Sequence, residues 1–242
     1  KPAGALLYGV TGSGKTSVFF RLIDSVLKSG RTALMMVPEI SLTPQMVKKF
    51  KLYFGDEIAL LHSSLSLGQR ADEFKRIRGG KAKIVIGTRS AVFAPLENIG
   101  LIIMDEEGER TYKSDQSPRY HARDAAIQRC GHHGCVLLMA SATPSIESIY
   151  YAKTGRFHLF EMRHRYADAV LPEVEIIDMQ SEAAAGNGSI FSRKLAEAVS
   201  ETLAKGEQAI LLLNRRGYTT YMSCAECREP ISCPNCGLPL TF

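Results

Sequence analysis

The chain has 242 residues, 45% of them hydrophobic and 23% charged, with a formal net charge of +5. This apolar content excludes a disordered chain, and no sequence period recurs that would indicate a repeat architecture. No apolar run reaches the ~18–20 residues of a membrane span and no signal-peptide pattern opens the sequence, so we expect a soluble, cytoplasmic protein. At ~150 residues per domain, the length predicts one complete domain and part of a second.

Short apolar runs alternate with longer amphipathic segments over the first 145 residues. Such runs, buried on both faces and joined by helices, indicate a parallel α/β sheet. The pair Thr43 and Pro44 has the order expected at a helix start. Strands are predicted at 6–8, 32–37, 84–86, 101–104 and 136–139, and helices at 16–29, 43–54, 68–78 and 118–129.

The pattern loosens after residue 157. Residues 157–174 are predicted to form a connector, and the small, flexible residues 181–189 a surface loop. A helix over 192–205 and a buried strand over 208–213 are expected next, as one more unit of the same kind.

The segment from Gly9 to Thr16 matches G-x-x-x-x-G-K-[ST] and stands between a predicted strand and a predicted helix. Its glycines let backbone N–H groups face phosphates, and the helix N-terminus adds a positive dipole end. Lys15 can reach the β- and γ-phosphates, and the Thr16 hydroxyl can bind Mg²⁺. The predicted ATP-binding residues are therefore Gly9, Val10, Thr11, Gly12, Ser13, Gly14, Lys15 and Thr16.

Three acids, Asp105, Glu106 and Glu107, follow the predicted strand 101–104. Acids at the end of a buried strand are costly unless a cation or hydrogen bonds compensate. Beside a P-loop, Asp105 is the expected Mg²⁺ partner, and Glu106 is placed to orient or deprotonate the attacking water. Lys15, Asp105 and Glu106 are therefore the predicted catalytic residues of an NTP hydrolase.

Polar residues follow other predicted strands as well. Ser141 and Thr143 come after 136–139, Arg89 stands in the segment 87–90, and residues 37–45 begin with Val-Pro-Glu. Ligands of parallel α/β sheets gather at the carboxyl ends of strands, and loops there can hold nucleic-acid phosphates.

Cysteines form two C-x-x-C pairs near the end of the chain, made by Cys224, Cys227, Cys233 and Cys236. Each pair can give two thiolates to Zn²⁺, so zinc binding is predicted. The five-residue gap between the pairs is short for one tetrahedral ion. Either one ion takes all four sulfurs in a strained loop, or the tail is metal-poor. Cys130 and Cys135, which bracket two histidines, are interpreted as structural.

Taken in order, GVTGSGKT, VPEISLTPQ, GTRSAVFAP, IIMDEEG, YKSDQSPRYHARD, ASATPS, LNRRGY and the two C-x-x-C pairs resemble the bacterial replication-restart helicases, the primosomal protein N-prime (PriA) family of superfamily 2. The resemblance implies a RecA-like ATP-binding domain over 1–160, a connector over 161–190, the start of a second RecA-like domain over 191–222 and a partial zinc-binding insertion over 223–242. In that family the two cysteine pairs serve different zinc ions, which later cysteines complete.

The resemblance also implies an activity and partners. It implies a DNA-dependent ATPase that unwinds DNA in the 3′→5′ direction at stalled forks, with ATP, Mg²⁺ and Zn²⁺ as cofactors. Its implied partners are forked or single-stranded DNA, single-strand-binding protein and the primosome proteins that reload the replicative helicase. We expect this helicase-domain fragment to be weakly active alone, since no arginine finger is recognisable.

The segment YKSDQSPRYHARD resembles the family's aromatic-rich loop, which senses DNA and communicates with the ATP site. Aromatic rings can stack on bases and cations can hold phosphates, although ordinary packing aromatics are the alternative. The family usually ends its acidic box in His, where this chain has Gly108, so a side-chain coupling contact is not expected there. The residues assigned to DNA contact or coupling are Arg89, Tyr112, Lys113, Arg119, Tyr120, His121, Ser141 and Thr143.

Two other classes compete with a helicase. One is a nucleic-acid-binding, primosome-assembly module with a vestigial ATP site. The other is a different P-loop enzyme, a transporter ATPase or a nucleotide kinase. A transporter ATPase would carry an LSGGQ-type signature and a nucleotide kinase an Arg-rich lid, and neither occurs in the sequence.

Overall fold

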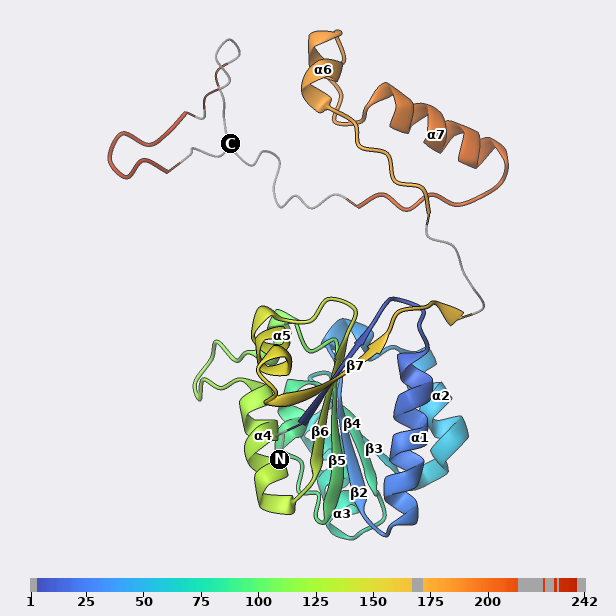
Figure 1. The fold of residues 1–242 in the computed structure, drawn as a ribbon, viewed down its shortest axis with the longest axis vertical. Coiled ribbons are helices and arrows are strands. Elements are labelled where there is room, and N and C mark those ends of the chain that lie inside the picture. The colour runs from blue at the N-terminus through green and yellow to red at the C-terminus, as the bar shows by residue number, and fades with distance from the viewer. Residues whose placement is uncertain (1–3, 167–171, 213–223, 225–228, 230, 239–242) are drawn as a thin grey trace. The chain divides into compact units, whose positions relative to one another are not determined.

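The computed structural model describes residues 4–166, 172–212, 224, 229 and 231–238 (Figure 1). The chain divides into two compact units, residues 1–171 and 172–242. Arg215 and Arg216 of the LNRRGY motif lie outside the described residues.

The first unit is built on a seven-stranded sheet in the order β3-β4-β2-β5-β6-β1-β7. All six strand pairs are parallel, which confirms the predicted parallel α/β class. The strands are β1 Gly4–Gly9, β2 Thr32–Met36, β3 Ile58–Leu61, β4 Ile84–Gly87, β5 Ile99–Asp105, β6 Val136–Ser141 and β7 Phe157–Met162.

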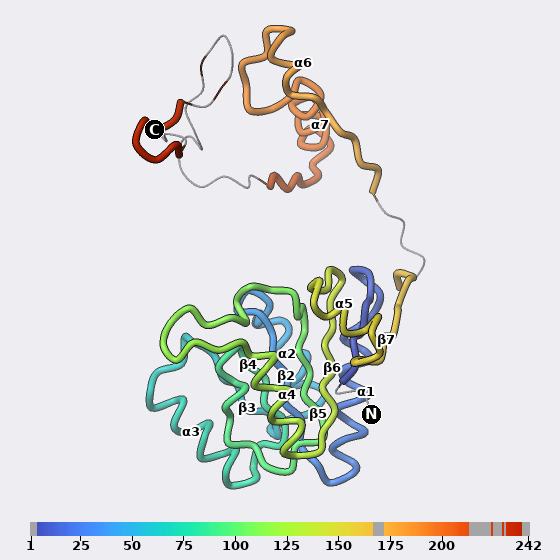
Figure 2. Tube along the Cα trace, turned by 60° about the vertical axis from the view of Figure 1, so that its left-hand side comes forward, coloured from blue at the N-terminus to red at the C-terminus, as the bar shows by residue number. Residues whose placement is uncertain are grey.

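Helices cover both faces of this sheet, and the core lies in two layers between them (Figures 1 and 2). Side chains of α1 and α2 pack on one face, and those of α3, α4 and α5 on the other. Successive β2 residues alternate between the two layers, as a strand buried on both faces requires. The helices are α1 Lys15–Lys28, α2 Pro44–Phe54, α3 Leu67–Arg78, α4 Ala122–His133 and α5 Ile146–Lys153, with short 3₁₀ turns at Glu39–Ser41, Gly55–Glu57, Arg89–Phe93 and Arg110–Tyr112.

Local capping accounts for most helix starts. Thr43 caps α2 by accepting from the Met46 N–H, with Pro44 in the first turn, as predicted. The α4 prediction is wrong at its start, because Ala122 rather than Pro118 opens the helix. An antiparallel bridge pairs Lys113 with His121, and residues 116–118 between them form bends, so the chain is not helical before Ala122.

Two strands were missed, and the predicted connector is wrong over its first six residues. Residues 157–162 form β7, which pairs with β1 from Gly4–Phe157 to Gly9–Met162. Most side chains of β7 are exposed, so the strand lacks the continuous apolar run of a buried strand. β3, with only four residues, was the other strand missed.

The described residues of the second unit form two helices, α6 Met179–Ala184 and α7 Arg193–Ala204. The helix over 192–205 is confirmed, with Ser192 as its cap, whereas the predicted loop 181–189 begins inside α6. The buried strand expected over 208–213 is wrong over its described residues, since Ile210 is 96% exposed. A β-strand needs a hydrogen-bonded neighbour, and the described part of this unit contains no strand for it to pair with.

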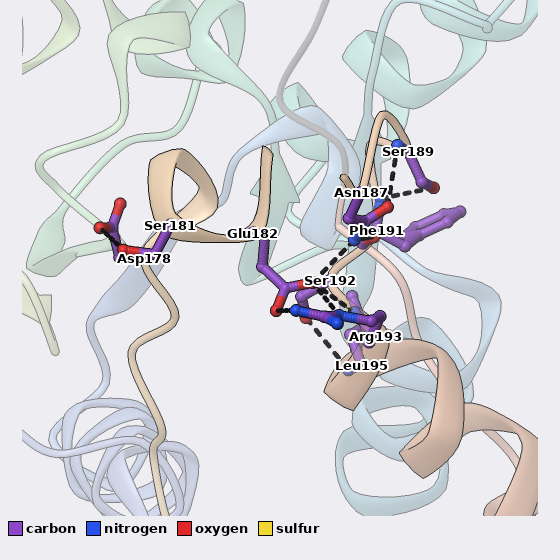
Figure 3. A network of polar contacts seen from close by, with 9 residues as sticks. All are labelled: Asp178, Ser181, Glu182, Asn187, Ser189, Phe191, Ser192, Arg193 and Leu195. Carbon is purple, nitrogen blue, oxygen red and sulfur yellow. Dashed lines mark hydrogen bonds and ion pairs between the residues drawn. The ribbon is translucent and has the colours of Figure 1, made fainter. Parts of the chain in front are cut away.

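A polar network joins the two helices of this unit (Figure 3). Glu182 of α6 accepts hydrogen bonds from the Arg193 N–H (2.9 Å) and from Asn187 Nδ2 (2.7 Å). These bonds, led by the one from the Arg193 backbone, lower the pKa of Glu182 to about 2. The Glu182 carboxylate therefore ties α6 to the first turn of α7.

Candidate active site and adjoining groove

The P-loop joins β1 to α1, and no side chain caps the first backbone N–H groups of α1. Gly12 and Gly14 have φ values of +79° and +89°, a conformation that glycine adopts without steric cost. Gly14 precedes α1 as its N-cap and makes no side-chain capping bond. The first amides of a helix have no intrahelical acceptor, so this loop can cradle an anion such as a nucleotide phosphate.

Lys15 is held at the base of this loop. Its Nζ donates to the Gly9 carbonyl at 2.9 Å and lies 3.9 Å from Glu106 Oε1. Gly9 has to be small, because a Cβ there would lie 2.8 Å from Ser13 Oγ. Ser13 Oγ is itself buried and finds no partner in the described part of the chain. The loop thus has the cation and the donors that nucleotide phosphates require.

The acidic turn follows β5, next to β6 and one strand away from β1. Burial, aided by the Glu106 charge, raises the pKa of Asp105 to about 6, while the Glu106 N–H and Lys15 oppose the rise. Glu106 has a φ of +45°, a strained conformation for a residue with a side chain. A half-buried, destabilised carboxylate and a neighbouring acid fit a divalent cation such as Mg²⁺.

Ser141, at the end of β6, orients the second acid. Its hydroxyl donates to Glu106 Oε2 at 2.9 Å and accepts from the Thr143 N–H at 3.0 Å. The structure therefore brings Ser141 and the Thr143 backbone to the predicted active site, at the end of the strand that neighbours β1.

Glu107 has a contact that the sequence did not indicate. Its carboxylate, only 2% exposed, accepts from the Ser145 N–H (2.7 Å), the Ser145 hydroxyl (3.1 Å) and the Ser148 hydroxyl (2.9 Å). Ser145 is the N-cap of α5, so these bonds tie the acidic turn to the loop after β6. The capping pattern of Ser145 was readable in the sequence, but its acidic partner 38 residues away was not.

Gly108, which stands in place of the family's usual His, lies against this same loop. A Cβ at Gly108 would be 2.8 Å from the Thr143 carbonyl oxygen and 3.4 Å from the Ser145 nitrogen. Both are backbone atoms, which cannot yield as a flexible side chain could. The Glu107 bonds and the missing Cβ at position 108 therefore belong to one close packing of two loops.

We expect Gly108→Ala to lower the free energy of unfolding by about 1–3 kcal/mol, because the added methyl overpacks this contact. Gly131→Ala is the matched control: position 131 lies in α4, where an added Cβ would meet no described atom outside the helix backbone within 4 Å, so alanine should add about 0.5–1 kcal/mol. Urea denaturation of both variants checks the pair, and equal effects would contradict the assigned packing.

A groove of about 450 Å³ opens at the carboxyl ends of β2, β3 and β4. It includes Arg89, from the predicted segment 87–90, and Lys113 from the aromatic-rich loop. Arg70 of α3 and Arg110 were not predicted. The lining residues are Val37, Glu39, Ser63, Arg70, Thr88, Arg89, Ser90, Arg110, Thr111, Lys113 and Asp115, so four cations face two acids.

The aromatic-rich loop is anchored to this groove through Arg89. Its guanidinium donates to the carbonyls of Thr111 (3.2 Å) and Lys113, and lies 5.9 Å from the ring centre of Tyr120. Tyr120 in turn packs edge-on against Phe93 at 4.9 Å. Arg89 and Tyr120 thus have packing contacts of their own, while Lys113 and Arg119 are exposed.

Tyr112 and His121 have structural partners. Tyr112 is fully buried and donates from its hydroxyl to the Asp105 carbonyl at 2.6 Å, so its ring is not available for stacking on bases. Instead it links the loop to the acidic turn. His121 caps α4 by accepting from the Arg123 N–H at its Nδ1, and burial lowers its pKa.

Of the predicted zinc ligands, Cys224, Cys233 and Cys236 are described and Cys227 lies outside the described residues. Within residues 4–166, 172–212, 224, 229 and 231–238, no three His, Cys, Asp or Glu side chains are grouped to hold a metal ion. Zinc binding stays a prediction.

The chain matches the DEAD/DEAH box helicase family over residues 3–150, and it belongs to that family. The match contains both the P-loop and the acidic turn. The replication restart protein PriA of Bacillus subtilis (strain 168) is 48% identical over 237 residues, which cover 98% of this chain and 29% of the relative. PriA of Synechocystis sp. is 45% identical over 242 residues, again 98% and 29%. The chain is a PriA homologue, as its motifs indicated, and spans under a third of these relatives' length.

Solved structures agree with the RecA-like fold. RecG bound to a three-way DNA junction has a TM-score of 0.54 at 22% identity, over 85% of this chain and 26% of RecG. The Hef helicase domain of Pyrococcus furiosus has a TM-score of 0.50 at 18% identity, over 84% and 52%. These likenesses support the fold alone. No helix among the described residues has the length and apolar character to cross a membrane.

Proposed function

We propose that the chain is the ATP-hydrolysing part of a 3′→5′ DNA helicase that acts in replication restart and primosome assembly. The observation that carries the proposal is the shared edge of the sheet. Strands β1, β5 and β6 end at the P-loop and acidic turn, and strands β2, β3 and β4 end at the cationic groove. One loop, 106–121, runs from the acids to the groove.

The chain's own residues divide the work of hydrolysis. Bound ATP with Mg²⁺ supplies the phosphoryl group that is transferred to water. The P-loop amides and Lys15 hold the phosphates, while Thr16 and Asp105 are the groups that would hold Mg²⁺. Glu106, oriented by Ser141, accepts a hydrogen bond or a proton from the attacking water.

Coupling to DNA runs through the loop 106–121. A DNA backbone in the groove would contact Arg70, Arg110 and Lys113. Arg89, which also lines the groove, is hydrogen-bonded to the loop, so a shift of Arg89 on DNA binding would move the loop. Tyr112 ends this path at the Asp105 carbonyl. With glycine at 108, the tie between the acidic turn and the loop after β6 rests on Glu107.

ATP turnover with and without single-stranded DNA tests this function. The helicase proposal expects Mg²⁺-dependent ATP binding and hydrolysis that DNA stimulates. A chain that binds DNA but not Mg²⁺-ATP would instead be a primosome-assembly module with a vestigial ATP site, and the helicase proposal would fail.

The groove makes a separate prediction through Lys113. We expect Lys113→Ala to weaken single-stranded DNA binding severalfold and to reduce the slope of log affinity against log salt by about 0.7, the loss of one phosphate contact. Lys81→Ala removes the same charge just before the amino end of β4, whereas the groove lies at the carboxyl end of that strand. This variant should leave both quantities unchanged. Fluorescence anisotropy over a salt series measures them. Equal losses in the two variants would argue against the groove as the DNA site.

The predicted second domain, zinc ligands and protein partners are also part of this proposal. We propose that residues 191–222 begin a second RecA-like domain and that Cys224, Cys227, Cys233 and Cys236 bind zinc, with single-strand-binding protein and primosome proteins as partners of the whole helicase. Zinc content per chain tests the metal site. One zinc supports a compact four-sulfur site, and none points to an incomplete insertion.

A further inference from the structure

Cys130 and Cys135 lie at the amino edge of the sheet, opposite to the active site. Cys130 is in the last turn of α4, and Cys135 directly precedes β6. The Cys135 N–H donates to the Cys130 carbonyl at 3.1 Å, and the two Sγ atoms are 2.7 Å apart. Two cysteines can be bridged only where the backbone already brings their side chains together, and this turn does so.

Two arginines are fixed beside this pair. Arg31 donates to the carbonyls of His133 (2.8 Å) and Ile99, and Arg129 donates to those of Val92 (2.6 Å) and Leu96 (3.0 Å). The thiol–thiol contact with Cys130, together with both guanidinium charges, lowers the pKa of Cys135. The same contact, together with burial, raises the pKa of Cys130.

The two thiols also differ in access. Cys130 is 5% exposed, whereas Cys135 is half-buried. In a redox-sensitive pair, an accessible thiol of low pKa reacts first with the oxidant. A second thiol beside it then attacks the modified sulfur and closes the disulfide. The neighbouring His132 and His133 pack on each other, and no metal-binding group forms here among the described residues.

We propose that Cys130 and Cys135 are a redox modification site, which a small-molecule disulfide such as glutathione disulfide converts to an intrachain disulfide. The Cys135 thiolate attacks one glutathione sulfur, the glutathione S–S bond breaks, and the first glutathione leaves as a thiolate that water protonates. The Cys130 thiol loses its proton to water and its sulfur attacks Cys135 Sγ, which releases the second glutathione. Two protein thiols are oxidised and one glutathione disulfide is reduced to two thiols.

Mass spectrometry of a single peptide tests the proposal. The full chain is equilibrated with glutathione and glutathione disulfide at several ratios, blocked with N-ethylmaleimide under denaturing conditions and digested with trypsin without reductant. Cleavage after Arg129 and Lys153 places both cysteines in the peptide 130–153, apart from the four C-terminal cysteines. We expect this peptide to appear unblocked and two hydrogens lighter as the disulfide share rises. A peptide carrying two maleimides at every ratio, or two glutathiones, would overturn the proposal.

Single variants test the order of the two steps. Cys130→Ala should trap one glutathione on Cys135, and Cys135→Ala should leave Cys130 to react at least ~10-fold more slowly. Because the pair lies at the edge opposite to the P-loop, both variants should bind Mg²⁺-ATP as the parent does, which confirms that they are folded. Faster trapping at Cys130 would overturn the role assigned to Cys135.

Discussion

Lys15→Ala is expected to reduce ATP turnover on the order of 10²- to 10³-fold, the loss found when one preorganised charge at a reacting group is removed. The Lys15 ammonium, 11% exposed and 3.9 Å from Glu106, is the cation that the structure holds within 4 Å of the acidic turn in the described part of the chain. Steady-state hydrolysis at saturating Mg²⁺ and single-stranded DNA measures the loss.

Lys28→Ala is the control for that variant. Lys28 ends the same helix, but its side chain is 75% exposed and pairs with Asp24 at 2.7 Å. An exposed pair of this kind contributes a few tenths of a kcal/mol, so turnover should stay unchanged. If Lys15→Ala kept more than about a tenth of the parent rate, hydrolysis would not depend on this P-loop and the vestigial-site alternative would gain.

Asp105→Asn should have two effects of opposite sign. It should abolish Mg²⁺-dependent ATP binding, since a neutral amide replaces the carboxylate that would hold the cation. It should also raise the free energy of unfolding at pH 7.5 by about 1–3 kcal/mol, because a rise of the Asp105 pKa from 3.8 to about 6 is worth roughly that cost of burying the charge. The amide keeps an oxygen to accept the bond from the Glu106 N–H.

The pH dependence follows from the direction of that shift. Well below pH 3.8, Asp105 is protonated in both the folded and the unfolded chain, and parent and variant should be equally stable. Between about pH 3.8 and about pH 6 the unfolded chain releases the proton first, so the parent loses stability as the pH rises and the gap opens. Urea denaturation in metal-free buffer at pH 4 and pH 7.5 measures it. A variant less stable than the parent at pH 7.5, or a gap as large at pH 4 as at pH 7.5, would contradict this account.

Local patterns were sufficient for the central part of the fold. Five of the seven strands and helices α1 to α4 were predicted, because each central strand is a continuous apolar run and each of these helices a periodic one. Helix α5 was not predicted. Both edge strands were missed. β7 exposes most of its side chains and was therefore interpreted as a connector, and β3 has only four residues. In the second unit the predicted strand over 208–213 is wrong over its described residues, because Ile210 and its neighbours are apolar but are not buried there.

The site divides in the same way. The chemistry of the P-loop and of the acids was predictable because it depends on residues adjacent in sequence, which bind a ligand through one continuous turn. Tyr112 shows where that reasoning ends, since the same aromatic residue type that stacks on bases is here buried against the Asp105 carbonyl. Sequence alone cannot separate the two uses of a tyrosine, because burial is decided by residues elsewhere in the chain.

The sequence by itself determined the class of protein, the nucleotide-binding residues and the order of the central elements, since these depend on short motifs and on hydrophobic periodicity. Only the tertiary structure decided how the sites are joined. It placed Glu107 on Ser145 and Ser148, left no room for a side chain at Gly108, added Arg70 to the groove and brought Cys130 against Cys135. Such contacts depend on which strand ends become neighbours in the parallel sheet, and strand order is a property of the packed fold that no local spacing contains.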